Sequence, residues 1–410
     1  MKGVCYMGKL AITGGSKLRA KGFPVWPVYG KEEADGLQRV LESRQWGTLG
    51  PEVKKFTEKF NKYLGVKYGV AVTNGTVTME VLLRAMGIGY GDEVLVPPYT
   101  FVATVSAVIT VGATPVFVDI DEETFNMDPE KMEVAITPAT KAVIPVHIGG
   151  RSCDMDKIMA VAKKHNLMVI EDAAHAHGSE WKGQKSGSVG TAGSFSFQAS
   201  KNLNSGEGGF ISTNDKELFE MSWGIHHCGR DYSGTVWYGH PLVGTNARMT
   251  EWQAVILNAQ LDRMDQQIDK RMENAKYLTS RLNEIGCIKT VPEDDRITRN
   301  SYHLYLFRYM EEQLKGLPRE KFLKALGAEG IPVSPGYTCL YKMPLFQTEQ
   351  MKKMTGSKID YTKVYLDVAE KVTEHQGVWT TQNVLLGEKE DMDDFANAII
   401  KVVENVDEIL

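Results

Sequence analysis

The amino-acid sequence predicts an α/β protein: a large domain with a mostly parallel sheet, followed by a smaller α+β domain. Short apolar runs alternate with helical stretches from about residue 68 to residue 198. The runs are rich in β-branched residues and apolar at successive positions, which is typical of parallel strands covered on both faces. The chain has 410 residues, more than one small core organises, so two domains are expected.

Two amphipathic helices are expected ahead of the sheet, over residues 31–46 and 51–64. In the second, Phe56 and Phe60 stand four positions apart and therefore share one face. Pro51 suits the first helical position, where its missing N–H has no intrahelical acceptor to lose.

The sheet itself is read from short apolar runs that end in polar or turn-forming residues. A helix over about residues 154–165 separates two of them. The runs are YGVAVT at 68–73, DEVLVPP at 92–98, TVSAVITVG at 104–112, TPVFVDI at 114–120, KAVIPVHI at 141–148, LMVIEDAA at 167–174 and GSFSFQ at 193–198.

The C-terminal part follows a long helix, which we expect from Thr250 to Leu282 and interpret as a connection between domains. A strand-like stretch, SYHLYLFRY, follows, with helical segments near 319–328 and 389–407. We therefore divide the chain into an N-terminal arm with the large domain at 1–280 and a small α+β domain at 281–410.

Composition excludes several classes of function. The net charge is −5 with no strongly basic stretch, so neither nucleic acid nor an anionic membrane is an expected partner. No run of 18 apolar residues predicts a membrane span, and the first residues do not resemble a signal peptide. The five cysteines are scattered without a CxxC pair, so no metal site or disulfide framework is expected and a cytoplasmic location fits.

The motif TNGT at residues 73–76 lies between a predicted strand and a predicted helix. Gly75 lets the backbone approach a ligand, and the free N–H groups of a helix start, at Gly75 and Thr76, favour an anion such as phosphate. The alternative is a simple helix cap by Asn74.

Two further motifs carry a carboxylate and a lysine. In VIEDAAHAHG, a strand ends in Glu171 and Asp172, and His175 follows; an acid at this place can hold a protonated pyridine nitrogen, although a helix cap and a core histidine are the alternative. In GSFSFQASKNLNSGEGG, Lys201 follows a strand, and partial burial there would make its amine a nucleophile rather than a solvated charge.

PPYTFVAT at residues 97–104 offers Tyr99 or Phe101 as a ring to lie on a flat cofactor, with core packing as the alternative. The order of phosphate cradle, ring-nitrogen acid and downstream lysine, all at strand ends, is more specific than any one motif. Together these motifs predict a site for pyridoxal phosphate.

These strings, with GDEVLVPPYTFVATVSAVITVGATPVFVDID and GTNARMTEWQAVILNAQLD, resemble the DegT/StrS group of sugar aminotransferases from about residue 25 onward. The resemblance implies the aspartate-aminotransferase-like fold (PLP fold type I) with a seven-stranded sheet, and pyridoxal 5'-phosphate (PLP, or PMP in its amino form) as cofactor. The roles that it implies within one chain are covalent attachment at Lys201, the ring nitrogen at Asp172, the phenolic oxygen at His175, stacking by Phe101, and phosphate binding by Gly75, Thr76, Ser196 and Gln198.

The resemblance also implies a homodimer with shared active sites. Asn246 would reach the phosphate of the other subunit, and Arg248 would stand near that subunit's substrate entrance. Tyr337 and Tyr341, in or beside SPGYTCLYKMPLF, are further substrate candidates. Thr245 and Tyr341 depart from residues that many relatives have there, which concerns the substrate and not the cofactor.

Within the group, the chain looks most similar to the aminocyclitol branch. That likeness implies transfer of an amino group from glutamine or glutamate to a keto-cyclitol or keto-sugar. Alternatives are an aminotransferase for a nucleotide-linked 3- or 4-keto-sugar, a fold-type I sugar dehydratase or lyase, and a catalytically silent protein on the same scaffold. Lys201 favours transamination, because dehydratase relatives replace this lysine with histidine.

Overall fold

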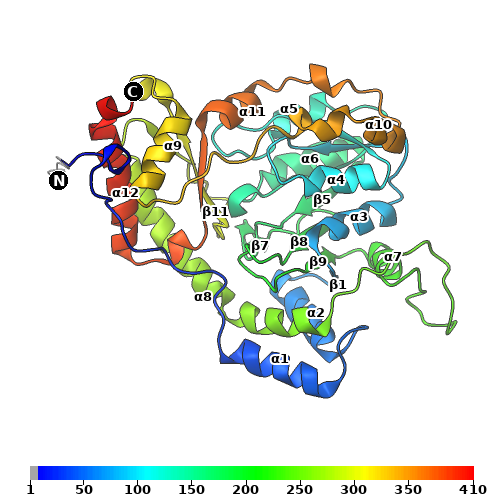
Figure 1. Cartoon of the computed structure of the whole chain (residues 1–410). Coiled ribbons are helices and arrows are strands. Elements are labelled where there is room, and N and C mark those ends of the chain that lie inside the picture. The colour runs from blue at the N-terminus through cyan, green and yellow to red at the C-terminus, as the bar shows by residue number, and fades with distance from the viewer. Residues whose placement is uncertain (1–7) are drawn as a thin grey trace.

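The computed structural model describes residues 8–410 and consists of a large and a small domain (Figure 1). The large sheet has the strand order β1-β9-β8-β5-β4-β2-β3. Its strands are β1 (Tyr68–Val72), β2 (Glu93–Val96), β3 (Thr114–Phe117), β4 (Thr140–Val143), β5 (Met168–Asp172), β8 (Ala192–Ser196) and β9 (Gly209–Thr213).

Only β9 runs against its neighbours in this sheet. It pairs antiparallel with both β1 and β8, whereas the pairs among β8, β5, β4, β2 and β3 are all parallel. The predicted seven-stranded, mostly parallel sheet is therefore confirmed. A small ribbon of β6 (Glu180–Trp181) and β7 (Gln184–Lys185) lies beside it.

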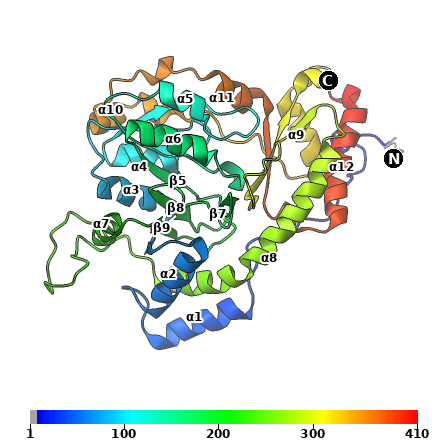
Figure 2. The same ribbon diagram turned by 180° about the vertical axis from the view of Figure 1, so that it is seen from behind.

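Helices cover both faces of the large sheet, as the apolar runs predict (Figures 1 and 2). In β5, Ile170 packs in the cluster under α3 and α4, whereas Val169 packs in the cluster under α6. Successive side chains thus enter opposite cores. The helices of this domain are α1 (Lys31–Ser43), α2 (Pro51–Leu64), α3 (Gly75–Ala85), α4 (Ala103–Thr110), α5 (Pro129–Val134), α6 (Met155–His165), α7 (Lys216–His226) and the first half of α8 (Glu251–Leu282).

The run at 104–112, which we counted among the apolar runs of the sheet, is wrong as a strand: it forms α4. Its residues Val105, Ala107, Val108 and Ile109 are all buried. A short helix buried nearly all round loses the polar face that would reveal its period, so pattern alone does not separate it from a buried strand.

The small domain contains an antiparallel sheet of β10 (Ile288–Thr290), β11 (Leu304–Tyr309) and β12 (Gly377–Thr381), in that order. Helices α9 (Arg319–Ala328) and α12 (Lys389–Glu404) share its core with the second half of α8, so the predicted α+β domain is confirmed. In Figure 2, α8 runs from the large domain to this one.

Two segments of the described chain pack in the domain on the other side of the predicted boundary. Leu10, near the N-terminus, packs in the core of the small domain. In the other direction, residues 340–369, with α10 (Glu349–Thr355) and α11 (Asp367–Lys371), return to the core of the large domain. The boundary drawn at 280/281 falls inside α8 and stays a prediction.

Within residues 8–410, no helix is long and apolar enough to cross a bilayer. The same range contains no cluster of three or more histidine, cysteine or acidic side chains that could hold a metal ion. The cysteines of that range (Cys153, Cys228, Cys287 and Cys339) are all free thiols, and Cys5 lies outside the described residues.

Candidate active site

The candidate site lies where β5 and β8 end and α3 begins. Asp172 is the last residue of β5, Lys201 follows β8 by five positions, and Gly75 opens α3. Gly75 stands against Ser196, since a Cβ added to this glycine would lie 2.6 Å from the Cβ of Ser196. The structure therefore brings together the cradle, the acid and the lysine that the sequence singles out.

Asp172 is buried, with 5% of its surface exposed, and both of its carboxylate oxygens accept a hydrogen bond. Thr104 Oγ1 in α4 donates to Oδ2 at 2.9 Å, and the Ala174 N–H donates to Oδ1 at 3.2 Å. Burial raises the pKa of Asp172, while these two bonds and the charge of Lys201 act against the rise. A cationic nitrogen beside this carboxylate would lower the cost of keeping it ionised.

Lys201 stands in a turn, where its backbone N–H donates to the Gln198 carbonyl at 2.8 Å. Burial lowers the pKa of Lys201 to about 8, and the charge of Asp172 opposes that shift. Compared with a surface lysine, a much larger share of its amine is therefore neutral near pH 7, as a nucleophile or proton acceptor requires.

Two histidine rings lie together in the same region, with ring centroids 4.2 Å apart. His175 Nδ1 accepts from the Gly149 N–H at 3.3 Å, so the neutral ring carries its proton on Nε2. His303 has the opposite tautomer. The Asn202 side-chain N–H donates to the Ser301 carbonyl at 2.7 Å, so Asn202 Oδ1 is left to accept from the His303 Nδ1–H at 3.3 Å.

Burial lowers the pKa of both His175 and His303 well below the ordinary value for histidine. The charge of Lys201 acts in the same direction on both rings. Each ring is therefore neutral at pH 7, and beside Lys201 His175 offers an N–H while His303 offers a lone pair.

The first turn of α3 has backbone N–H groups for which the described chain offers no acceptor. Asn74 Oδ1 accepts from the Val77 N–H at 3.0 Å, so the cap is real. The N–H groups of Gly75 and Thr76 nevertheless find no acceptor among residues 8–410. The cap is therefore compatible with the predicted anion cradle, because it uses only one of the four free N–H groups at a helix start.

The other two polar residues assigned to the phosphate differ in how free they are. Ser196 is buried beside Gly75, and its Oγ accepts from the Gln198 N–H at 3.4 Å. Gln198 Oε1 accepts from both the backbone and the hydroxyl of Ser200, at 2.8 and 2.7 Å. Only the amide nitrogen of the Gln198 side chain is left to contact a ligand.

The two aromatic candidates after β2 separate clearly. Tyr99 is fully buried and packs against Phe125, whereas Phe101 is 57% exposed. Core packing therefore explains Tyr99 but not Phe101.

The substrate candidates divide in the same way. The half-buried ring of Tyr337 contacts Tyr99 and Trp379, with centroids 5.6 and 4.6 Å away, and the charge of Asp172 acts on its hydroxyl. Tyr341 is buried and donates its hydroxyl to Glu370 Oε1 at 2.8 Å, so the structure does not place it with the site residues.

Asn246 and Arg248 flank Ala247, whose carbonyl accepts from the Thr73 N–H at 2.9 Å beside the start of the cradle. Asn246 is exposed. Arg248 Nη1 donates to His227 Nδ1 at 3.2 Å and lies 3.3 Å from the Cys228 sulfur.

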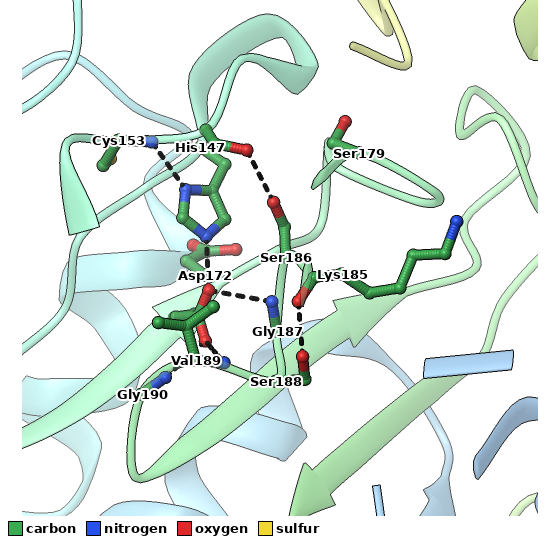
Figure 3. Close-up of polar contacts among 12 residues, drawn as sticks. His147, Cys153, Asp172, Ser179, Lys185, Ser186, Gly187, Ser188, Val189 and Gly190 are labelled. Atoms are coloured by element: carbon green, nitrogen blue, oxygen red, sulfur yellow. Dashed lines mark hydrogen bonds and ion pairs between the residues drawn. The ribbon is translucent and has the colours of Figure 1, made fainter. Parts of the chain in front are cut away.

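A second polar network lies directly behind Asp172 (Figure 3). His147 Nε2 bonds Glu171 Oε2 at 2.8 Å, and His147 Nδ1 accepts from the Cys153 N–H at 3.0 Å. The remaining capacity of Glu171 is taken by the backbone N–H groups of Gly187, Val189 and Gly190, all within 2.8 Å. Glu171 thus fixes the turn before β8 and the loop after β4, while Asp172 faces the site.

Sequence reasoning missed Thr104, His303 and His147. Thr104 is the second residue of α4 and comes four residues after Thr100, and nothing in that spacing signals a partner on β5. His303 offers one weak signal, a histidine at the start of a strongly apolar strand pattern. His147 likewise follows an apolar strand. Its position at a strand end is the signal in the sequence that could have identified it.

The sequence pattern of the DegT/DnrJ/EryC1/StrS aminotransferase family matches residues 27–377. A protein of Micromonospora echinospora, provisionally named an L-glutamine:3-amino-2,3-dideoxy-scyllo-inosose aminotransferase, is 40% identical over 408 residues, which cover 97% of this chain and 98% of that protein. GDP-perosamine synthase of Caulobacter vibrioides is also 40% identical, over 80% of this chain and 88% of its own length.

Solved structures agree with these matches. The crystal structure of 3-amino-5-hydroxybenzoic acid synthase superposes with a TM-score of 0.85 at 33% identity, covering 94% of this chain and 99% of that one. A provisionally named sugar aminotransferase from Streptococcus pneumoniae, solved in its PMP form, gives a TM-score of 0.82 at 27% identity, with 96% and 100% covered.

Proposed function

This chain belongs to the DegT/DnrJ/EryC1/StrS aminotransferase family and is a PLP-dependent aminotransferase, and we propose that it transfers the amino group of L-glutamine to a keto-cyclitol. The observation that carries the chemistry is that half-buried Lys201, with a pKa lowered to about 8, stands near enough to the buried Asp172 carboxylate for each charge to shift the other's pKa. Glutamine and a cyclitol are favoured because a relative with that name matches nearly the whole of both chains.

The site fits the phosphate and ring of PLP. The phosphate suits the free N–H groups of Gly75 and Thr76, and Ser196 closes the cradle because no side chain at position 75 intervenes. The ring nitrogen suits Asp172, whose buried carboxylate forms no ion pair within the described residues and feels only the charges of Lys201 and His147. The exposed ring of Phe101 is available to lie on the pyridine face.

Two further residues complete this assignment. The Nε2–H of His175 is a donor suited to the phenolic oxygen of the cofactor, since Nδ1 of the same ring is occupied by Gly149. The amide nitrogen of Gln198 remains free for the phosphate, while Tyr337 borders the substrate side.

When bound, PLP supplies an aldehyde that attaches an amine and a ring that takes up the electrons of the donor's α-carbon. Lys201 Nζ accepts and returns the α-proton, for which a pKa of about 8 is suitable because the amine is neither permanently charged nor a strong base. Thr104 orients the Asp172 carboxylate, and Asp172 holds a proton on the ring nitrogen.

We propose a homodimer with shared active sites. The segment between α7 and α8 projects from the body in Figure 1 and carries Trp237 and Tyr238, which are 87% and 70% exposed. Such large apolar surfaces are typical of contacts with another chain. Asn246 and Arg248 lie at the base of this segment, from which they would serve the second subunit. We also propose a cytoplasmic location, which suits free thiols.

The first test follows the two half-reactions. Protein loaded with PLP is treated with L-glutamine or L-glutamate, and conversion to the amino form is followed by absorbance. The amino form is then offered 2-deoxy-scyllo-inosose, and the product is identified by mass spectrometry. Failure of both donors would refute transamination and return a lyase or a silent protein to consideration.

A nucleotide-linked 3- or 4-keto-sugar is the second candidate acceptor, because GDP-perosamine synthase is equally identical over a shorter stretch. The same assay separates the two acceptors. Consumption of the amino form by a nucleotide-linked keto-sugar, and not by keto-cyclitols, would overturn the proposed acceptor and leave the aminotransferase assignment intact.

A further inference from the structure

Arg271, in the middle of α8, is a fully buried arginine without an acidic partner. Its Nε and Nη2 both donate to Gln382 Oε1, with the Nε contact at 3.0 Å, and its Nη1 has no acceptor. The ring of Trp26 lies over the guanidinium, 5.2 Å from its central carbon. Burial lowers the pKa of Arg271 to about 9, and no carboxylate opposes the shift.

The other buried arginines of the described chain, Arg19 and Arg319, have partners for the terminal nitrogens of their guanidinium groups, although Arg19 Nε has no acceptor. Arg19 lies 2.8 Å from Asp391 and 2.7 Å from Asp394. Arg319 donates to several backbone carbonyls, of which those of Thr373 and Gly377 lie at 2.7 and 2.8 Å. A buried charge that meets only a neutral amide is costly, because the lost hydration is not replaced. Arg271 therefore has the properties of a residue that receives an anion.

Arg271 borders the region of Lys201. Burial is the main cause of the lowered pKa of His303, and the charge of Arg271 acts in the same direction, after His175, Lys201 and His177. Trp26, which lies on Arg271, donates its indole N–H to the carbonyl of Ala199, two residues before Lys201, at 3.0 Å. This region of the described chain therefore contains two basic side chains, Lys201 and Arg271, but only one buried carboxylate that faces the site, Asp172.

We propose that Arg271 binds the α-carboxylate of the amino donor. This inference rests on the proposed function. A guanidinium matches a carboxylate through paired N–H groups, and Nη1 is the one that the protein leaves open. The cofactor phosphate has its own cradle at Gly75, so it does not supply this anion. For a donor to reach Arg271, a side chain that covers it must move. Trp26 and Gln382 both contact it, and Trp26 is the more exposed of them, so we assign the movement to Trp26.

The two substrates should depend on Arg271 differently. Every α-amino acid donor carries a carboxylate, whereas a keto-cyclitol carries none. Loss of the guanidinium should therefore weaken the donor half-reaction and spare the acceptor half-reaction. A merely structural arginine would weaken both or neither.

The test compares two probes that lack the reacting amine. Glutaramate has the carboxylate and amide of glutamine, and pentanediamide has an amide in place of that carboxylate. On the PLP-loaded protein, calorimetry should give a preference for glutaramate of about 10- to 100-fold, the range expected for hydrogen bonds to a charged group. Arg271→Met should abolish this preference, and the matched control Arg281→Met, on the same helix but paired with Asp393, should keep it.

A second variant covers the case in which Arg271→Met does not fold. Gln382→Glu places a carboxylate where Gln382 Oε1 now accepts from Arg271, so the guanidinium gains an internal counter-ion. The melting temperature should hold or rise, and the glutaramate preference should fall at least tenfold. A preference retained in both variants would overturn the proposal. That result would leave the proposed function standing, provided that wild-type protein still forms its amino form with glutamine.

Discussion

The lowered pKa of Lys201 predicts how fast its amine captures an aldehyde and how Asp172 controls that rate. A shift from 10.5 to about 8 raises the neutral fraction at pH 7 by about 300-fold, since each pKa unit is a factor of ten. Asp172 holds the pKa up, against burial. Asp172→Asn removes that attraction, so the pKa of Lys201 should fall below 8 and capture at pH 7 should become faster, although transamination should fall.

Salicylaldehyde is a suitable probe for this effect, because it has no ring nitrogen and so does not need Asp172 for binding. The rate of capture by cofactor-free protein is measured from pH 6 to 10, and borohydride reduction with peptide mapping confirms Lys201 as the site. In wild-type protein the rate should rise with pH and level off near 8, and in Asp172→Asn it should level off at lower pH. Slower capture in the variant at pH 7 would refute the electrostatic reasoning, and Lys201→Met shows the background.

Other predictions test the cradle, the network behind Asp172 and the dimer. Gly75→Ala brings a Cβ within 2.6 Å of the Ser196 Cβ, so PLP affinity should fall at least tenfold in fluorescence titration while the melting temperature drops by a few degrees; unchanged affinity would remove the cradle. Glu171→Gln leaves backbone donors and His147 without a full acceptor set, so urea unfolding should show a loss of about 3 kcal/mol or more. Trp237→Ser should shift the protein toward monomer in sedimentation, and an unchanged dimer would exclude this ring from the interface.

Much of the fold could be predicted because local pattern and long-range packing agree. The helix expected from Thr250 to Leu282 begins one residue later, with Thr250 as its capping residue, and ends at Leu282. The reversed direction of β9 could not be predicted, because parallel and antiparallel strands buried on both faces share the same composition. α4 was hidden for a related reason, since most of its residues are buried and it has no charged face that would reveal a helical period.

The candidate site also contains residues that the sequence could predict and residues that it could not. Asp172 and Lys201 could be predicted because they follow strands, and strand ends collect at one edge of a parallel sheet. Arg271 could not, because a charged residue in a helix of many charges is usually solvated, and its burial arises from Gln382 and Trp26, each more than 100 positions away. His303 reaches Lys201 only through the return of the small domain against the large one.

The adjacent acids at the end of β5 show how one strand separates structural from chemical roles. Side chains alternate along a strand, so Glu171 and Asp172 face opposite layers. Glu171 meets His147 and backbone donors on the α6 side, where its pKa is lowered by these partners despite burial. Asp172 meets Thr104 on the α4 side, where burial prevails and its pKa is raised. Asp172 is therefore the acid of this strand whose charge is not met by structural partners, and a protonated ring nitrogen beside it would oppose the upward shift of its pKa.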